Sequence, residues 1–338
     1  MRTRLMALVL AATGALAAAG CQYIQSRRAI DHYVRGQILA DEGRLDEALR
    51  ELARAVQSDP DLSVAHCAMG DIYRRQGLYE QAQQSYERSC EANPYAFRPH
   101  YNLGVVYQIL AEAAKTVQRG QDLLRKAVAV YLRAITIEPD DFEANLNLSA
   151  CYFALDKYAL AEKYCRAAIA LKPGSPQAYS NLGIIYDSQE RLYEAIKAYK
   201  DSLELDVHQP KLLMNLGSTY MRQGRLKAAM EAFQLAVREA PDSAAAHEQI
   251  GTCFYHMKNY DKALAAYEKA RSLDDDSAGA YRGIGVVHMT RYLLDPKNAE
   301  LRDKALKAWH TSLELKPDQE DIIRLVRKYS PKVTGPEL

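Results

Sequence analysis

A spacing of 34 residues recurs through most of this 338-residue chain and limits its fold more than any other feature. Each copy starts with a small residue, then has a large side chain three residues later, and later an Ala with a large side chain four residues beyond it. The small residues are Gly36, Gly70, Gly104, Ser149, Gly183, Gly217, Gly251 and Gly285. The alanines are Ala48, Ala82, Ala127, Ala161, Ala195, Ala229, Ala263 and Ala305. Self-similarity at such a period indicates one structural unit stacked many times.

Each unit is predicted to contain two short helices. Helices of this length are marginal in isolation. The small residue of the first helix allows the second helix to approach closely, and the Ala of the second helix faces it. Aromatic side chains then fill the space between successive pairs. Such units are stable only when stacked, which predicts an elongated solenoid.

The pattern of small residue, aromatic, Ala, aromatic and closing Pro resembles the tetratricopeptide repeat. Eight units are expected, at 29–62, 63–96, 97–141, 142–175, 176–209, 210–243, 244–277 and 278–319. The resemblance implies an all-α, right-handed α-solenoid whose first helices line a concave groove. Residues 320–338 are expected to form a capping helix and a tail, because Asp321–Tyr329 has an amphipathic period.

The third and eighth units are longer than the others. In the third, both helices are expected to extend, with a break near Gly120. In the eighth, the stretch 292–305 contains Pro296 and is expected to form a loop. These insertions could serve as contact surfaces or be tolerated surface length.

The first twenty residues have a different character. Two arginines precede an apolar run that ends in small residues before Cys21, as in a secretory signal peptide. The Gly20-Cys21 ending resembles a bacterial lipobox, although Ala18 stands where Leu is usual. That resemblance implies a signal peptide at 1–20, lipid attachment at Cys21, a tether at 21–28 and, because Gln22 is not Asp, the periplasmic face of the outer membrane. Ordinary cleavage to a soluble periplasmic protein is the alternative.

Asn recurs on the predicted groove face. On a helical wheel, unit positions 2, 6, 9 and 13 lie opposite the packed face. Position 6 is Asn102, Asn147, Asn181 and Asn215 in four successive units. An amide offers both a donor and an acceptor to a peptide backbone, and the ladder resembles that of O-linked N-acetylglucosamine transferase. Peptide binding and simple solvation of a polar groove are both consistent with it. No Lys–Asn pair occupies positions 5 and 9, which disfavours a carboxylate clamp.

Signals of chemistry are weak. His32, His66, His100 and His247 each occupy position 4 of separate units, so no two of them could ligate one metal ion. Cys67–Cys90 and Cys151–Cys165 could each bridge one repeat in an exported protein. No catalytic motif is present, so no catalytic residue, metal or cofactor is expected. With 44 basic against 43 acidic residues, the chain has no field for nucleic acid, and no small-molecule substrate is expected.

These features predict a non-catalytic scaffold or adaptor in the bacterial cell envelope that binds an extended peptide or a partner protein in its groove. One alternative resembles pilotin lipoproteins, which assist assembly of a secretin, and would bind an amphipathic helix. Another is an accessory subunit of an envelope enzyme. In every case the partners are proteins, with the membrane reached through lipid on Cys21.

Overall fold

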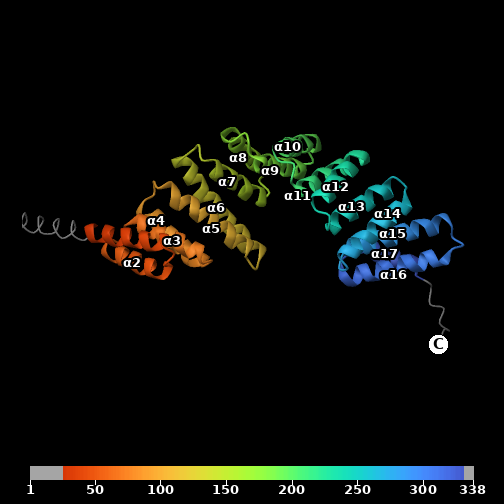
Figure 1. Cartoon of the computed structure of the whole chain (residues 1–338), viewed down its shortest axis with the longest axis horizontal. Helices are drawn as coiled ribbons and strands as arrows, with labels where there is room; N and C mark the ends of the chain where they lie inside the picture. Colours follow the sequence, from red (N-terminus) through yellow and green to blue (C-terminus); the bar gives the residue numbers. More distant parts are fainter. Residues whose placement is uncertain (1–25, 331–338) are drawn as a thin grey trace, which may run out of the picture. The chain divides into compact units, whose positions relative to one another are not determined.

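The computed structural model describes residues 26–330, and every regular element among them is a helix (Figure 1). The chain divides into two compact units, one ending at Pro173 and one starting at Gly174. Within each unit, consecutive helices such as α3 and α4 pack against each other as helical hairpins. The all-α helix-pair fold predicted from the 34-residue spacing is therefore confirmed.

The N-terminal unit contains four helix pairs. The first pair consists of helical residues 26–41 and α2. The elements from α2 onward are α2 (Leu45–Ser58), α3 (Ser63–Arg75), α4 (Tyr79–Ala92), α5 (Phe97–Glu112), α6 (Val117–Ile137), α7 (Phe142–Ala154) and α8 (Tyr158–Leu171).

The C-terminal unit contains four more pairs and one final helix. Its elements are α9 (Pro176–Ser188), α10 (Leu192–Leu205), α11 (Pro210–Arg222), α12 (Leu226–Glu239), α13 (Ala244–His256), α14 (Tyr260–Leu273), α15 (Ala278–Leu294), α16 (Ala299–Leu315) and α17 (Glu320–Tyr329).

The small residue of each pair works as the repeat pattern requires. A Cβ atom added at Gly70 would lie 2.6 Å from the ring of Tyr86, and one added at Gly183 would lie 2.3 Å from the ring of Tyr199. Both rings are fully buried. Ser149 replaces Gly in one repeat, and there its hydroxyl donates a hydrogen bond to the carbonyl of Ala161 at 2.8 Å. Close packing of ring on backbone therefore holds each pair together.

The two insertions mainly lengthen helices. In the third pair the break lies at 113–116, where the Thr116 side chain accepts a hydrogen bond from the backbone N–H of Arg119. Gly120 lies inside α6, so the break expected there is wrong. A Thr N-cap is a stronger start signal than one Gly is a stop, because the cap supplies a hydrogen bond to the first turn.

The eighth pair also differs from expectation. Residues 292–305 were expected to form a loop, but only 295–298 connect α15 to α16. Both helices extend into this stretch because Pro296 lies in the short connection, where it removes no hydrogen bond from either helix.

The helix α17 covers the end of the last pair. Its Ile322 is buried in a cluster with Leu306 and Trp309 of α16. The predicted capping helix is therefore present. None of the helices between residues 26 and 330 has both the length and the apolar character needed to cross a lipid bilayer.

Candidate functional site

The four recurring asparagines lie on the first helices of four successive pairs and differ in exposure. Asn102 is on α5 and is only 8 % exposed. Asn147 on α7 and Asn181 on α9 are half-buried, and Asn215 on α11 is exposed. The four amides share a repeat position but not an environment.

Asn102 is part of a buried polar network. Its amide nitrogen donates a hydrogen bond to Oδ1 of Asp71 at 2.9 Å, and the Tyr86 hydroxyl donates to the same oxygen at 2.7 Å. Arg98 donates to Oδ2 of Asp71 at 2.5 Å. Burial, followed by this contact, raises the pKa of Tyr86. Asp71 is 9 % exposed, and a buried carboxylate requires such donors. Asn102 therefore connects α5 to α3 instead of facing open solvent.

Asn147 reaches back in the same way. Its amide nitrogen lies 3.3 Å from the hydroxyl of Tyr101, which belongs to α5 in the preceding pair. Burial raises the pKa of Tyr101, so the ring stays neutral and its hydroxyl oxygen accepts this bond. In the N-terminal unit, both amides thus hold one first helix to the first helix before it.

Asn181 and Asn215 have a different setting. Among residues 26–330, no side-chain hydrogen bond joins either amide to another protein group. The helices α9 and α11 are linked instead by Asp187, which accepts from Thr219 at 2.7 Å and pairs with Arg222 at 2.6 Å. These two amides are thus available to another molecule, and their role in peptide binding stays a prediction.

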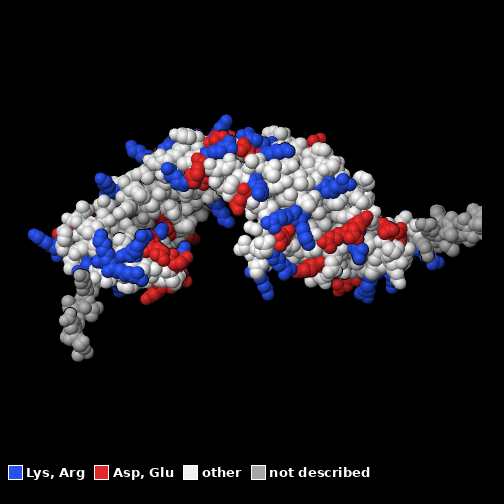
Figure 2. Space-filling model, turned by 180° about the vertical axis from the view of Figure 1, so that it is seen from behind, with Lys and Arg blue, Asp and Glu red and all other residues white. Residues whose placement is uncertain are grey.

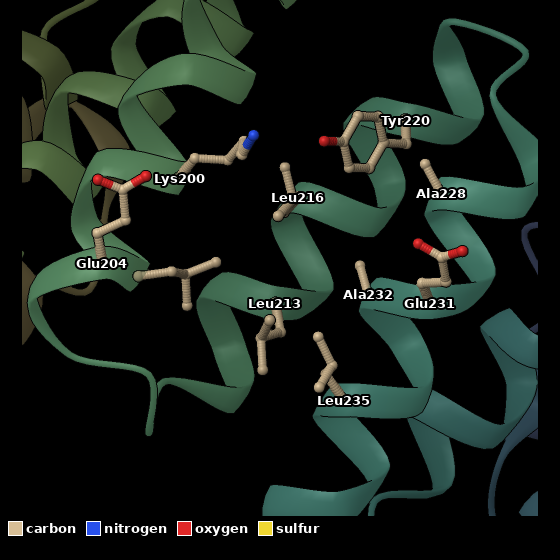
Figure 3. Close-up of a pocket in the computed structure, with 10 residues that line it drawn as sticks. Lys200, Glu204, Leu213, Leu216, Tyr220, Ala228, Glu231, Ala232 and Leu235 are labelled. Atoms are coloured by element: carbon tan, nitrogen blue, oxygen red, sulfur yellow. The ribbon is translucent and has the colours of Figure 1, made fainter.

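The C-terminal unit also has an apolar pocket, which we call the α10–α12 pocket (Figure 3). Its volume is about 290 Å³. Side chains from α10, α11 and α12 converge on it, and Figure 3 shows Lys200 and Glu204 on one side and Glu231 on the other. The lining consists of Lys200, Leu203, Glu204, Leu213, Leu216, Tyr220, Ala228, Glu231, Ala232 and Leu235. Four leucines and two alanines give the pocket an apolar wall, beside the charged side chains of Lys200, Glu204 and Glu231.

The sequence contains a signal for this pocket that the repeat pattern alone does not reveal. Leu213 stands at position 4 of its repeat, where the flanking repeats have the polar ring residues Tyr179 and His247. Leu235 likewise stands at position 26, where the repeats on either side have Asp201 and Lys269. At both positions an apolar side chain stands where the flanking repeats have a polar one, which gives this repeat an apolar surface suited to an apolar guest.

The possible metal ligands and the cysteines are the other side chains that could take part in chemistry. Within the described chain, no cluster of three or more His, Cys, Asp or Glu could hold a metal ion. In the described chain no disulfide joins Cys67 to Cys90 or Cys151 to Cys165, and Cys253 forms none either. Burial raises the pKa of Cys67 to about 12, and that of Cys90 likewise, so neither is a reactive thiolate.

Charges of both signs are mixed over the surface. Figure 2 shows Lys and Arg interspersed with Asp and Glu on the face in view. No single-sign field favours a polyanion there, which agrees with the balanced composition of the chain.

The chain is similar to several known proteins. The family model of the cilia and flagella-associated protein 70 C-terminal domain matches residues 6–283. No curated protein sequence matches. The hetero-tetramer Cut9-Hcn1 of APC/C is 17% identical with a TM-score of 0.55, over 94% of this chain and 55% of that chain. The pilF protein of Pseudomonas aeruginosa is 18% identical with a TM-score of 0.51, over 64% and 94%. YrrB, a TPR protein with an unusual peptide-binding site, is 21% identical with a TM-score of 0.47, over 58% and 97%.

Proposed function

This chain belongs to the family of the cilia and flagella-associated protein 70 C-terminal domain and is a tetratricopeptide-repeat protein, and from this premise we propose that it is a non-catalytic scaffold that grips an extended polypeptide through Asn181 and Asn215. The observation that carries the proposal is that these two amides have no intramolecular partner in the described chain, whereas Asn102 has one at 2.9 Å.

The geometry of neighbouring repeats suits an extended chain. Packed helices lie about 10 Å apart, and about three residues of extended polypeptide span that distance. One amide can donate to a peptide C=O and accept from a peptide N–H. Such contacts read the backbone and not the side chains, so the scaffold would bind many sequences.

A permanently unfolded probe tests this directly. We expect reduced, carboxymethylated α-lactalbumin to bind the chain, and the double variant Asn181→Ala/Asn215→Ala to bind at least about fivefold more weakly, since two amide hydrogen bonds contribute on the order of 1–3 kcal/mol. Asn298→Ala is the matched control, because this exposed Asn lies in the connection before α16. Equal affinity of the double variant and the control would sink the proposal.

A second candidate function rests on the α10–α12 pocket. An amphipathic helix recognised there would insert one or two apolar side chains between α10 and α12. This mode suits a pilotin-like assembly factor or an accessory subunit of an envelope enzyme. It predicts that Leu213→Tyr abolishes partner binding while Asn181→Ala/Asn215→Ala does not, which is the reverse of the first candidate.

We also propose that the chain is exported and tethered to the periplasmic face of the outer membrane by lipid on Cys21, a residue that lies outside the described range. The sequence around Gly20-Cys21 supports this proposal. Metabolic labelling with palmitate should mark the full chain and be lost in Cys21→Ala. Absence of label in the parent chain would exclude the lipid tether and favour export as a soluble periplasmic protein.

A further inference from the structure

Helical residues 26–41 carry an apolar stripe that nothing in the described chain covers. Ile30 is 52 % exposed, Val34 47 % and Ile38 53 %. These residues, together with Arg27 and Asp41, lie within about 80° of one another around the helix. We call these five residues the repeat-1 stripe. All five are exposed.

The other repeats show what this face normally does. Ile38 comes two residues after the small packing residue of its pair. The residues at that place in later repeats are 2 % exposed or less: Ile72, Val106, Cys151, Ile185, Thr219, Cys253 and Val287. Ile72, for example, packs in one cluster with Ala48 and Leu52 of the preceding pair. At Ile38 the repeat-1 stripe is thus a stacking face without its neighbour, and Ile30 and Val34 extend its apolar surface onto repeat positions 2 and 6. Terminal repeats usually have a polar outer face, because an apolar one is exposed to water.

We propose that a second copy of this chain covers the repeat-1 stripe, through antiparallel pairing of the two 26–41 helices around a two-fold axis at Val34. The order of residues in the stripe is symmetric about Val34. Ile30 and Ile38 lie four residues on either side of it, and Arg27 and Asp41 lie seven residues on either side. Two-fold pairing therefore places Val34 against Val34 of the other copy and Ile30 against Ile38.

Charge complementarity selects this occupant. The same pairing sets Arg27 of one copy against Asp41 of the other at both ends of an overlap of about 21 Å. Among residues 26–330, neither Arg27 nor Asp41 takes part in an ion pair or side-chain hydrogen bond within the chain, so each is available to the other copy. A self-complementary patch of this kind is the signature of an isologous dimer. The proposal does not depend on the asparagines and survives if they bind nothing.

Crosslinking at the two-fold axis tests the pairing in cells that produce the full chain with its own leader. Val34→Cys should be joined to its own symmetry mate by a short bis-maleimide. Val207→Cys is the matched control, because Val207 is a valine of the C-terminal unit with 52 % exposure. We expect a crosslinked dimer at least about fivefold more abundant for Val34→Cys than for the control. Equal yields would overturn the proposal.

Charge exchange tests the orientation. In the Val34→Cys background, Arg27→Asp and Asp41→Arg should each lower the dimer yield about fivefold to tenfold, because each places two like charges opposite each other. The combination Arg27→Asp/Asp41→Arg restores both pairs and should restore the yield. Co-expression of the two single variants should also restore it, in a mixed dimer. Failure of both rescues would overturn the antiparallel pairing.

Two other occupants would give distinct results. If residues 5–19 of the same chain cover the stripe, the Val34→Cys thiol will be shielded from a monofunctional maleimide while the chain stays monomeric. If the stripe contacts lipid, the purified Val34→Cys chain will bind vesicles of anionic phospholipid without forming a dimer. Either result would overturn the proposal.

Discussion

Replacing Asn102 by Ala should destabilise the N-terminal unit even though Asn102 has the same repeat position as the exposed Asn215. The substitution removes one of three donors to the Asp71 carboxylate, which is 9 % exposed. A hydrogen bond to a charged group contributes about 1.5–3 kcal/mol, and a buried acceptor that loses its donor also loses solvation. Because Tyr86 and Arg98 remain bound to Asp71, we expect the lower part of that range, about 2 kcal/mol.

Hydrogen exchange measured by mass spectrometry can detect this change locally. A loss of about 2 kcal/mol corresponds to roughly 30-fold faster exchange of backbone amides in α3 and α5. Asn215→Ala is the control, since an exposed side chain without a protein partner should change stability by less than about 0.5 kcal/mol.

The double variant Asp71→Ala/Asn102→Ala measures the coupling energy between Asp71 and Asn102 apart from their other contacts. If the contact is the cause, the combined loss will be smaller than the sum of the two single losses, because both remove the same hydrogen bond. Protection in α3 and α5 that differs less than about threefold between Asn102→Ala and Asn215→Ala would refute the reasoning.

Three further results are expected. Gly183→Ala places a Cβ 2.3 Å from the Tyr199 ring and should lower the unfolding free energy by about 1–3 kcal/mol, whereas Gly174→Ala meets no atom within 4 Å and should be neutral in the same urea titration. Burial against the first turn of α15 raises the pKa of the Glu248 carboxyl. The stability contributed by its bound proton is therefore fully present below pH 4.5 and is lost as the pH rises through the folded-state pKa. Glu248→Gln should reduce this loss and leave the unfolding free energy at pH 4 unchanged. Leu213→Tyr should fill the α10–α12 pocket and remove the fluorescence of a bound apolar dye, at a cost of about 1–3 kcal/mol in unfolding free energy because Leu213 is buried. Persistence of that fluorescence would count against the pocket.

Much of the fold could be read from one-dimensional spacing. A Gly or Ser in the first helix and a ring in the second must meet wherever two helices pack at this distance, so pairs such as Gly70 and Tyr86 identify each unit without any knowledge of the rest. The insertions were harder to place, because the weak signals of Gly120 and Pro296 competed with capping by Thr116 and with the helix propensity of the flanking residues.

The candidate site was predicted only in part. Position 6 was found from the sequence, but the sequence could not reveal that Asn102 is held by Asp71, a partner 31 residues away. The α10–α12 pocket escaped the repeat pattern because its signal is a change from polar to apolar side chains at Leu213 and Leu235 and not a motif.

The sequence by itself determined that this protein is a series of helix pairs, since that architecture follows from contacts within each repeat. The tertiary structure alone decided which repeated residues are free to act. Asn215 is exposed where Asn102 is buried, and Ile38 is exposed where Ile72 is buried. The physical reason is that exposure depends on the neighbouring pair, which presents Asp71 to Asn102 and is missing beside Ile38, whereas a periodic sequence assigns every copy the same face.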